Sequence, residues 1–270
     1  SISPSIIDII NKEGNTENFQ GVANISALSS KVLLEGPIPF SLVKGSWMIA
    51  GRRTYFDQIL KSYESIPPYY FYDIQGHIFT DLTYKDRLSV SFYEGLDDFE
   101  YGPIAINADW GNITRSIKYR RLFNEKLIGN FLIAKSKFFV NFGLGGSSGI
   151  NEEDLIDDQT TSGNVSYFLN NDVTIKTGFQ HKKLKFSYQT FFDDSTLFSL
   201  ITFPTDWSVY TQAKYVLNDK WVIEPGIRLN HYEKYYTNLR LGLKYIIQTD
   251  EFINFAIGNY DQFLFTFQDD

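Results

Sequence analysis

An alternation of apolar and polar side chains runs through residues 72–84, YDIQGHIFTDLTY. Side chains of a β-strand point to opposite faces with a period of two, so Tyr72, Ile74 and Ile78 share one face. The other face carries Asp73, Gln75, His77, Phe79, Asp81 and Thr83. Because a helix would scatter these charges around its axis, the pattern predicts an amphipathic strand.

The same alternation recurs in later segments, where every second residue is apolar. The charged residues on the polar side of these segments are Arg87, Lys183, Lys185, Glu224, Arg228, Arg240 and Lys244. The predicted strands are roughly 10 to 18 residues long, whereas strands of soluble sheets average about 5–6 residues. A tilted strand needs about 9–11 residues to cross a bilayer, so these strands are long enough to span a membrane.

The composition agrees with membrane-spanning strands. Aromatic residues make up 17% of the 270 residues, with 24 Phe and 18 Tyr, and these residue types favour strands. We find no apolar run near the ~18 residues of a membrane helix. The chain has no Cys, and its net charge of −7 argues against a nucleic-acid partner. It does not begin with Met and shows no signal peptide, which indicates a processed or trimmed form.

Turn residues and aromatic residues are placed as in an outer-membrane barrel. Short polar turns are predicted at Lys85–Asp86, Asn124–Lys126, His181–Lys182, Asn218–Asp219 and Thr249–Asp250, and longer loops at 61–68, 97–109, 146–162, 194–205 and 231–236. Short turns on one side and long loops on the other are typical of such barrels. Aromatic residues suited to an interfacial girdle are Tyr72, Tyr84, Trp110, Trp207, Trp221 and Tyr245.

The sequence therefore predicts an all-β, antiparallel, up-and-down transmembrane barrel in the bacterial outer membrane, with about 12–14 strands in this chain. A soluble β-sandwich or propeller is the alternative fold. The residues predicted to face the lumen are Asp73, Gln75, His77, Asp81, Arg87, Lys183, Lys185, Glu224, Arg228, Arg240 and Lys244. Because this set carries both charge signs, it suits a wet lumen or a polar plug, and the simplest interpretation is wall residues that pair with one another.

Enzymatic or metal chemistry finds little support in the sequence. The three His residues lie in different predicted strands or turns, and only His77 near Ser89 offers a conceivable hydrolase pair. The acidic stretch 151–158 could supply oxygen ligands to Ca²⁺, but it lacks the spacing of a calcium loop, so a solvated acidic loop is the preferred interpretation. We expect no cofactor, no metal site and no enzyme activity. Of Arg52 and Arg53, one is expected to reach the lumen and the other lipid phosphates.

The order of several short motifs resembles TonB-dependent receptors of the Bacteroidetes type. The stretch SIIDIINKEG (5–14) resembles the end of the plug domain of that family. The motifs resembling its first barrel strands and later segments are LEGPI (34–38), GSW (45–47), GRRTYFD (51–57), PYYFYD (68–73), KDRLS (85–89), WGN (110–112) and GNYDQF (258–263). The resemblance thus divides the chain into the end of a plug or a linker at 1–16 and barrel strands at 17–270.

The resemblance implies a 22-stranded barrel filled by a plug, which takes up a scarce nutrient such as a metal chelate, glycan or peptide. It also implies energy from TonB, which grips a segment that would precede residue 1. Further expected partners are outer-membrane lipid or lipopolysaccharide, the rest of the barrel or another subunit, and a surface lipoprotein. The alternatives are a passive porin, a structural barrel component of an assembly, and an outer-membrane hydrolase. An open edge in a barrel is costly, so we expect this chain to be the N-terminal part of a larger barrel rather than a small self-closing one.

Overall fold

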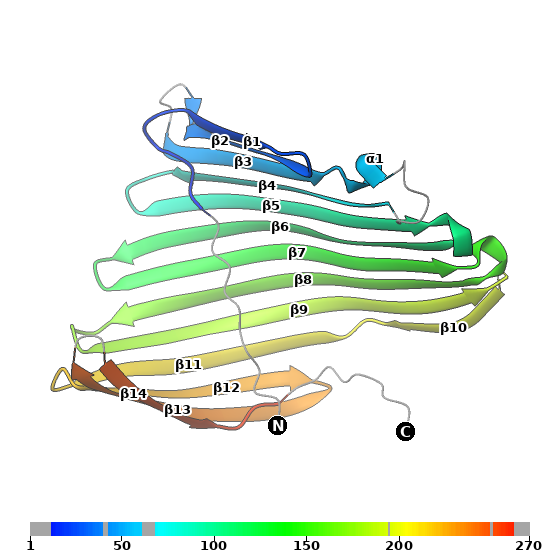
Figure 1. Cartoon of the computed structure of the whole chain (residues 1–270). Coiled ribbons are helices and arrows are strands. Elements are labelled where there is room, and N and C mark those ends of the chain that lie inside the picture. Colours follow the sequence, from blue (N-terminus) through cyan, green and yellow to red (C-terminus); the bar gives the residue numbers. More distant parts are fainter. Residues whose placement is uncertain (1–11, 40–42, 61–67, 194, 249–250, 262–270) are drawn as a thin grey trace. The chain divides into compact units, whose positions relative to one another are not determined.

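The computed structural model describes residues 12–39, 43–60, 68–193, 195–248 and 251–261. Expectations that fall on residues 1–11, 61–67 and 249–250 lie outside the described residues. The strand order in the sheet is β1 to β9 and then β11 to β14, with β10 paired to β9 (Figure 1). The strands are β1 (Gln20–Ile25), β2 (Ser29–Pro37), β3 (Lys44–Thr54), β4 (Tyr69–Asp81), β5 (Asp86–Tyr101), β6 (Ile106–Asn124), β7 (Leu127–Leu144), β8 (Ile150–Phe168), β9 (Val173–Phe192), β10 (Ser195–Thr202), β11 (Thr205–Leu217), β12 (Trp221–Tyr232), β13 (Lys234–Gln248) and β14 (Glu251–Gly258).

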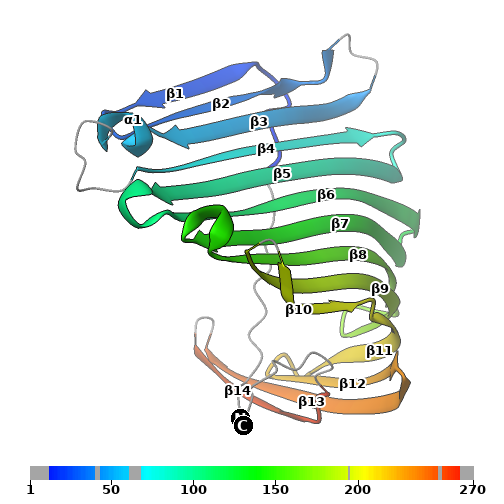
Figure 2. The ribbon, with the colours of Figure 1, turned by 90° about the vertical axis from the view of Figure 1, so that its right-hand side faces the viewer.

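Helices play a small part in this fold. In the described part of the chain, the short α-helix α1 (Phe56–Leu60) follows β3, and the 3-10 helices η2 (Gly102–Ile104) and η3 (Gly146–Ser148) connect long strands. Figure 2 shows α1 beside the ends of β3 and β4. Among the described residues, no helix has both the length and the apolar character needed to cross a bilayer.

The chain divides into two compact units, which are described separately. Unit 1 contains β1–β5 and residues 106–117, 136–155 and 188–199. Unit 2 contains residues 118–135, 156–187 and 200–202 together with β11–β14. Within each unit the described strands pair antiparallel, and residues that face each other in a pair project to the same side of the sheet.

The register in unit 1 confirms the alternation predicted for residues 72–84. Met48 faces His77, and His77 faces Ser91, so these residues lie on one side. The other side carries apolar side chains that are 36–43% exposed, which are Val32, Ile49, Ile74, Ile78, Val90 and Phe92. The polar face of unit 1 is therefore opposite an apolar face that is open to its surroundings.

Unit 2 has the same two-sided character. On β11–β13 the even-numbered residues form the polar face, where Gln212 faces Gly226 and Gly226 faces Arg240. The odd-numbered residues form the apolar face, which includes Val209, Ile227 and Leu239 at 44%, 44% and 57% exposure. A sheet that keeps such large apolar side chains exposed has not buried them in a compact water-soluble core.

The predicted short turns are found where Asn or Asp supports the backbone. Asn218 and Asp219 have positive φ angles of 54° and 55°, which these two residue types tolerate in a tight hairpin turn. Asn124 accepts a hydrogen bond from the Lys126 N–H in the next predicted turn. A further turn, missed in the sequence, lies between β8 and β9, where the Asn170 side chain accepts hydrogen bonds from the N–H groups of Asp172 and Val173.

Several predicted turns and loops are wrong, because the strands continue through them. The turn expected at His181–Lys182 lies in the middle of β9. Most of the loop expected at 146–162 belongs to β8, and 97–101 belongs to β5. Likewise the loops expected at 194–205 and 231–236 are largely taken up by β10 and by the ends of β12 and β13. Residues 97–101 and 151–158 carry polar side chains on both sides of the strand, so the period of two is lost there.

Candidate functional site

The polar face of unit 1 brings together the predicted residues of β4 and β5 through ion pairs and hydrogen bonds. Arg52 on β3 pairs with Asp73 at 2.6 Å. Arg87 binds both carboxylate oxygens of Asp81, at 2.6 and 3.0 Å. Such a two-point contact fixes the guanidinium in one orientation. Gln75 faces Ala50 and Tyr93 on the same side. Ion pairs therefore join several of the predicted residues on this face.

His77 takes part in this face as a hydrogen-bonding residue. Its Nδ1 lies 2.8 Å from Ser91 Oγ, directly across the β4–β5 pair. The sequence suggested Ser89 as the neighbour of His77, but Ser89 faces Phe79. The residue across from His77 is therefore Ser91, two residues further along β5 than the Ser89 that the sequence suggested.

The segment before β1 lies over the polar face of unit 1. Lys12 Nζ is 2.8 Å from Glu35 Oε1, and Glu13 Oε1 is 3.1 Å from Arg87 Nη1. Gly14 sits against the backbone of β3, because a Cβ atom there would come within 2.1 Å of the Trp47 carbonyl oxygen. Glu35 is only 6% exposed beneath this segment. Two ion pairs and one close backbone contact therefore hold residues 12–14 on the polar face.

The same region of unit 1 contains four further deeply buried side chains. Ser46, Phe79, Ala50 and Met48 are between 0% and 7% exposed, and all belong to the polar face by the strand register. Phe79 also lies under Arg87, whose guanidinium carbon is 4.2 Å from the ring centroid. The sequence correctly placed Phe79 among polar neighbours, and the structure shows it covered by Arg87.

Arg228 is the centre of a polar cluster in unit 2. It donates hydrogen bonds to Asn230 Oδ1 at 2.7 Å, to Gln180 Oε1 at 2.8 Å and to Ser208 Oγ at 2.6 Å. Asn230 in turn donates to Asn238, which donates to Asp261 at 2.7 Å. Ser208, Asn230 and Asn238 are 3%, 7% and 9% exposed. Buried polar groups of this kind are stable only when they are paired, and here they are.

An ion pair between β8 and β9 forms a second polar group on this face. Lys182 Nζ lies 2.8 Å from Asp158 Oδ2, and Lys182 faces Asp206 on β11. Apart from Arg228 itself, the sequence interpretation missed the members of both groups. The common signal of the members that lie in strands is parity, because each of them falls on an even-numbered position that shares the face of Arg228.

The remaining predicted residues of unit 2 divide between the two faces. Arg240 donates to Gln212 Oε1 at 2.8 Å, Glu224 faces Gly242, and Lys244 Nζ lies 3.8 Å from the Phe252 ring centroid. All three belong to the polar face with Arg228. The three residues Arg240, Glu224 and Lys244 are exposed or half-buried, so they are more accessible than the Arg228 cluster.

Lys183 and Lys185 do not share that face, and this part of the prediction is wrong. Lys183 faces Thr205, one position from the Lys182–Asp206 pair, so its side chain projects from the opposite side of the sheet. Lys185 follows two residues later in the same continuous strand and has the same parity. The cause is the wrongly placed turn at His181–Lys182. Strand β9 continues through this point without a break. Phe179 and His181 lie on the apolar side, so the odd-numbered residues Lys183 and Lys185 lie there too.

Aromatic residues border the apolar face of unit 2 at both ends. At one end Trp207 faces His231 and His231 faces Tyr235, with Trp207 stacked on His231 at 5.5 Å. At the other end the Trp221 and Tyr245 rings lie 4.6 Å apart, beside Leu217. Ten residues of β11 separate Trp207 from Leu217, or about 33 Å along the strand. At a tilt of about 40° this spans ~25 Å, the height of a membrane-facing apolar band between aromatic girdles.

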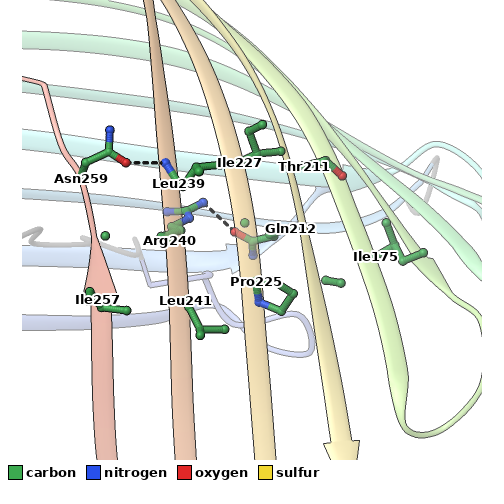
Figure 3. Close-up of a pocket in the computed structure, with 13 residues that line it drawn as sticks. Ile175, Thr211, Gln212, Pro225, Ile227, Leu239, Arg240, Leu241, Ile257 and Asn259 are labelled. Atoms are coloured by element: carbon green, nitrogen blue, oxygen red, sulfur yellow. Dashed lines mark hydrogen bonds between the residues drawn. The ribbon is translucent and has the colours of Figure 1, made fainter.

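The apolar face of unit 2 is hollowed where side chains are small. One hollow of about 680 Å³ lies along β9 and β11–β14. Figure 3 shows Pro225, Ile227 and Leu241 along it, with Arg240 hydrogen-bonded to Gln212 and the Leu239 N–H to Asn259. A second hollow of about 510 Å³ lies along β7–β9, β11 and β12. Both are lined mainly by apolar groups of the odd-numbered face.

The apolar face of unit 1 ends part-way along β5. Leu88, Val90 and Phe92 are followed on the same side by Glu94, Leu96, Asp98 and Glu100. Charged groups are costly on a lipid-facing surface. Residues 94–101 of β5 and the facing start of β4 therefore lie beyond the apolar band. Tyr69, which lies in this part, donates a hydrogen bond to Asp97 at 2.5 Å, and burial together with this bond raises the pKa of Tyr69 to about 12.

Asp98, in the same part of unit 1, gives a prediction for the pH dependence of stability. Burial raises the pKa of Asp98, and the carboxylates of Asp109, Glu100 and Asp57 raise it further. The native state therefore holds this proton more tightly than the unfolded chain does. The resulting stability is full below the pKa of the unfolded chain and is lost as the pH rises through the native pKa.

We expect Asp98→Asn to raise the unfolding temperature relative to the unchanged protein, with a difference that grows from about pH 4 to pH 7. Thermal unfolding in detergent at several pH values would measure it. Asp172→Asn, in an exposed turn, is the matched control and should show a smaller and flatter difference. An equal pH profile for the two variants would contradict the assignment.

No three His, Asp or Glu side chains converge on a common point within the described ranges, so the acidic stretch 151–158 forms no cluster suited to a metal ion there. Instead, its members are distributed along β8 on both faces. Asp157 pairs with Lys135 at 3.4 Å and Asp158 with Lys182 at 2.8 Å. The preferred interpretation as a solvated loop is wrong in structure, since the stretch is a strand.

Solved structures with a similar strand arrangement include three receptors from Pseudomonas aeruginosa and Yersinia pestis. The siderophore receptor PirA from Pseudomonas aeruginosa is 12% identical with a TM-score of 0.64, over 91% of this chain and 40% of that one. The ferric yersiniabactin uptake receptor FyuA from Yersinia pestis is 11% identical with a TM-score of 0.65, over 92% and 47%. The ferripyoverdine receptor of the outer membrane of Pseudomonas aeruginosa is 11% identical with a TM-score of 0.68, over 86% and 41%.

These strands have the fold of part of an outer-membrane receptor barrel. The chain spans less than half the length of the structures that it matches. No protein-family model matches the sequence, and no curated protein matches it either. The predicted all-β class, with antiparallel strands of an outer-membrane barrel type, is confirmed by the fourteen antiparallel strands of the described residues and by this likeness.

Proposed function

We propose that this chain forms part of an outer-membrane barrel that takes up a scarce nutrient, with energy supplied through TonB. The observation that carries the proposal is the likeness of nearly the whole chain to a siderophore receptor, a ferric yersiniabactin uptake receptor and a ferripyoverdine receptor. The ligands in those descriptions favour a metal chelate over a glycan or a peptide. The order of the short motifs further supports the proposal that the chain is similar to TonB-dependent receptors of the Bacteroidetes type.

Two features of the described residues support the transport proposal over a passive porin. Residues 12–14 are held on the polar face of unit 1 by Lys12–Glu35 and Glu13–Arg87, as a segment inside a barrel would be. The polar face carries paired charges of both signs, which suits a lumen that is filled by polar protein. A plug must be moved for transport, which is why an energy source is part of the proposal.

The test is uptake of an iron-loaded chelate by cells that express the protein at native level. We expect uptake to saturate with chelate concentration and to disappear both when the gene is deleted and when TonB is deleted. Flux that rises linearly and persists without TonB would overturn the proposal in favour of a porin.

A matched pair of variants tests the polar face in the same assay. Arg240→Gln removes a positive charge from the polar face, and Lys220→Gln removes one from the exposed turn between β11 and β12. We expect the concentration for half-maximal uptake to change in the Arg240 variant alone. Equal behaviour of the two variants would contradict a role of this face in the ligand path.

A further inference from the structure

We infer that the apolar face of unit 2 binds one lipopolysaccharide molecule, with a lipid A phosphate at Lys183 and Lys185 and an acyl chain in the adjacent hollow. The inference rests on the outer-membrane location proposed above. It starts from the corrected parity of β9, which moves two lysines from the predicted lumen to the side that faces lipid.

Three layers of different chemistry follow one another along this face. Lys183, which faces Thr205, and Lys185 supply positive charge. The next layer is aromatic, with His181 facing Trp207, Trp207 stacked on His231, and His231 in edge contact with Tyr235 at 4.7 Å. The third layer is apolar and contains Phe179, Val209 and Leu229. A phosphorylated lipid has the matching order of parts. Its phosphate would lie at the charged layer, the start of its chains at the aromatic layer, and its hydrocarbon at the apolar layer.

The third layer contains space for an acyl chain. The hollow of about 510 Å³ is lined on this face by Phe131, Gly163, Thr177, Phe179, Val209 and Leu229. Gly163 keeps it open, because a Cβ atom there would come within 2.7 Å of the Phe179 ring and 2.8 Å of the Phe131 ring. Phe179 is four residues from Lys183, or about 13 Å along the strand, so head group and chain can be bound together.

Charge on this face favours an anionic head group. Lys183 is exposed. The neighbouring Lys182 forms an ion pair with Asp158, but both of these side chains lie on the polar face of the sheet. Asp157, which has the parity of the apolar face on β8, is paired with Lys135. Its negative charge is therefore balanced, and Lys183 and Lys185 add positive charge.

The position of Lys183 and Lys185 along β9 indicates which leaflet of the outer membrane they face. Strand β9 continues for nine residues beyond Lys183 to Phe192, whereas at its other end a short turn at residues 169–172 joins it to β8. The longer segments beyond the membrane lie on the extracellular side of outer-membrane barrels, and the extension of β9 past Lys183 is such a segment. Lys183 and Lys185 therefore lie towards the outer leaflet, whose lipid is lipopolysaccharide, rather than towards the phospholipid of the inner leaflet.

The experiment is native mass spectrometry of the protein purified in detergent and titrated with phosphorylated lipid A, dephosphorylated lipid A or phosphatidylglycerol. We expect phosphorylated lipid A to bind most tightly. Lys183→Gln with Lys185→Gln should weaken it about 10- to 30-fold, as the loss of two charges near a phosphate predicts. Lys176→Gln removes the same charge from the polar face of the same strand and should change binding less than about twofold.

Thr177→Phe places a ring in the hollow without changing charge, and we expect it to weaken binding of phosphorylated lipid A as well. The inference is overturned if the double lysine variant binds like the unchanged protein, if dephosphorylated lipid A binds as tightly as the phosphorylated form, or if phosphatidylglycerol binds as tightly as lipid A. Unfolding temperatures of the variants would show that they fold. Insertion into liposomes and chelate uptake are measured separately. A protein that inserts and takes up chelate but shows no selectivity for lipid A would contradict this inference and leave the proposed function intact.

Discussion

Arg228→Met is expected to lower the free energy of unfolding by about 3 to 5 kcal/mol, because a charged donor of three hydrogen bonds disappears from a buried cluster. The loss leaves Ser208 Oγ, Gln180 Oε1 and Asn230 Oδ1 without the donor that they accept from. Since Ser208 and Asn230 are 3% and 7% exposed, water cannot replace that donor unless the sheet opens. Denaturant unfolding of the protein in detergent, followed by tryptophan fluorescence, would measure the loss.

Arg240→Met is the control for this experiment. Arg240 lies on the same face one strand away, carries the same charge, and makes a hydrogen bond to Gln212 from an exposed position. We expect this variant to lose less than about 1 kcal/mol, because water can solvate the freed amide. If the two methionine variants were equally destabilised, the Arg228 cluster would have no special role.

Lys12→Met is expected to cost about 2 to 3 kcal/mol and to release residues 12–19 from the sheet. It strands the Glu35 carboxylate, which is 6% exposed, without its cation. The expected cost is below the 3–5 kcal/mol of a fully buried pair, because the Lys12 side chain is itself 59% exposed and some water can reach the site. Hydrogen–deuterium exchange of residues 12–19 would report the release directly.

The double variant Lys12→Met with Glu35→Leu separates the ion pair from simple packing. Removing both charges leaves no stranded carboxylate, so we expect stability and exchange to return most of the way to those of the unchanged protein. A double variant that is less stable than Lys12→Met alone would show that Glu35 serves the fold through contacts other than Lys12.

The parts of the fold that the sequence predicted well lie inside the apolar band. There one face meets an apolar medium, so the alternation around Ile74 and Ile78, or around Leu239 and Leu241, is sharp. Beyond the band both faces are wet, and polar residues occupy both. That is why residues 97–101, 151–158 and 181–185 resembled loops or turns although they belong to β5, β8 and β9.

The sequence predicted the face of several single residues of the candidate site, but not the clusters that they form. Alternation placed Arg87, Arg228 and Arg240 on the polar face correctly. The partners of Arg228 come from β9, β11 and β12, and Gln180 is 48 residues away in the chain. Nothing local in the sequence fixes the strand register that joins them. The ion pairs of Lys12 and Glu13 depend on how the segment before β1 crosses the sheet, which no periodicity encodes.

Glu94, Asp98 and Glu100 lie on the side of β5 that is apolar further along the strand, and they affect which part of the protein is accessible from outside the membrane. Residues 94–101 continue about 26 Å along the strand past the apolar band. This part of the wall would stand above the lipid head groups as a rigid rim, so antibodies or phage would meet strands there and not only loop tips. A short epitope tag inserted after Gly102 should accordingly be reachable on intact cells.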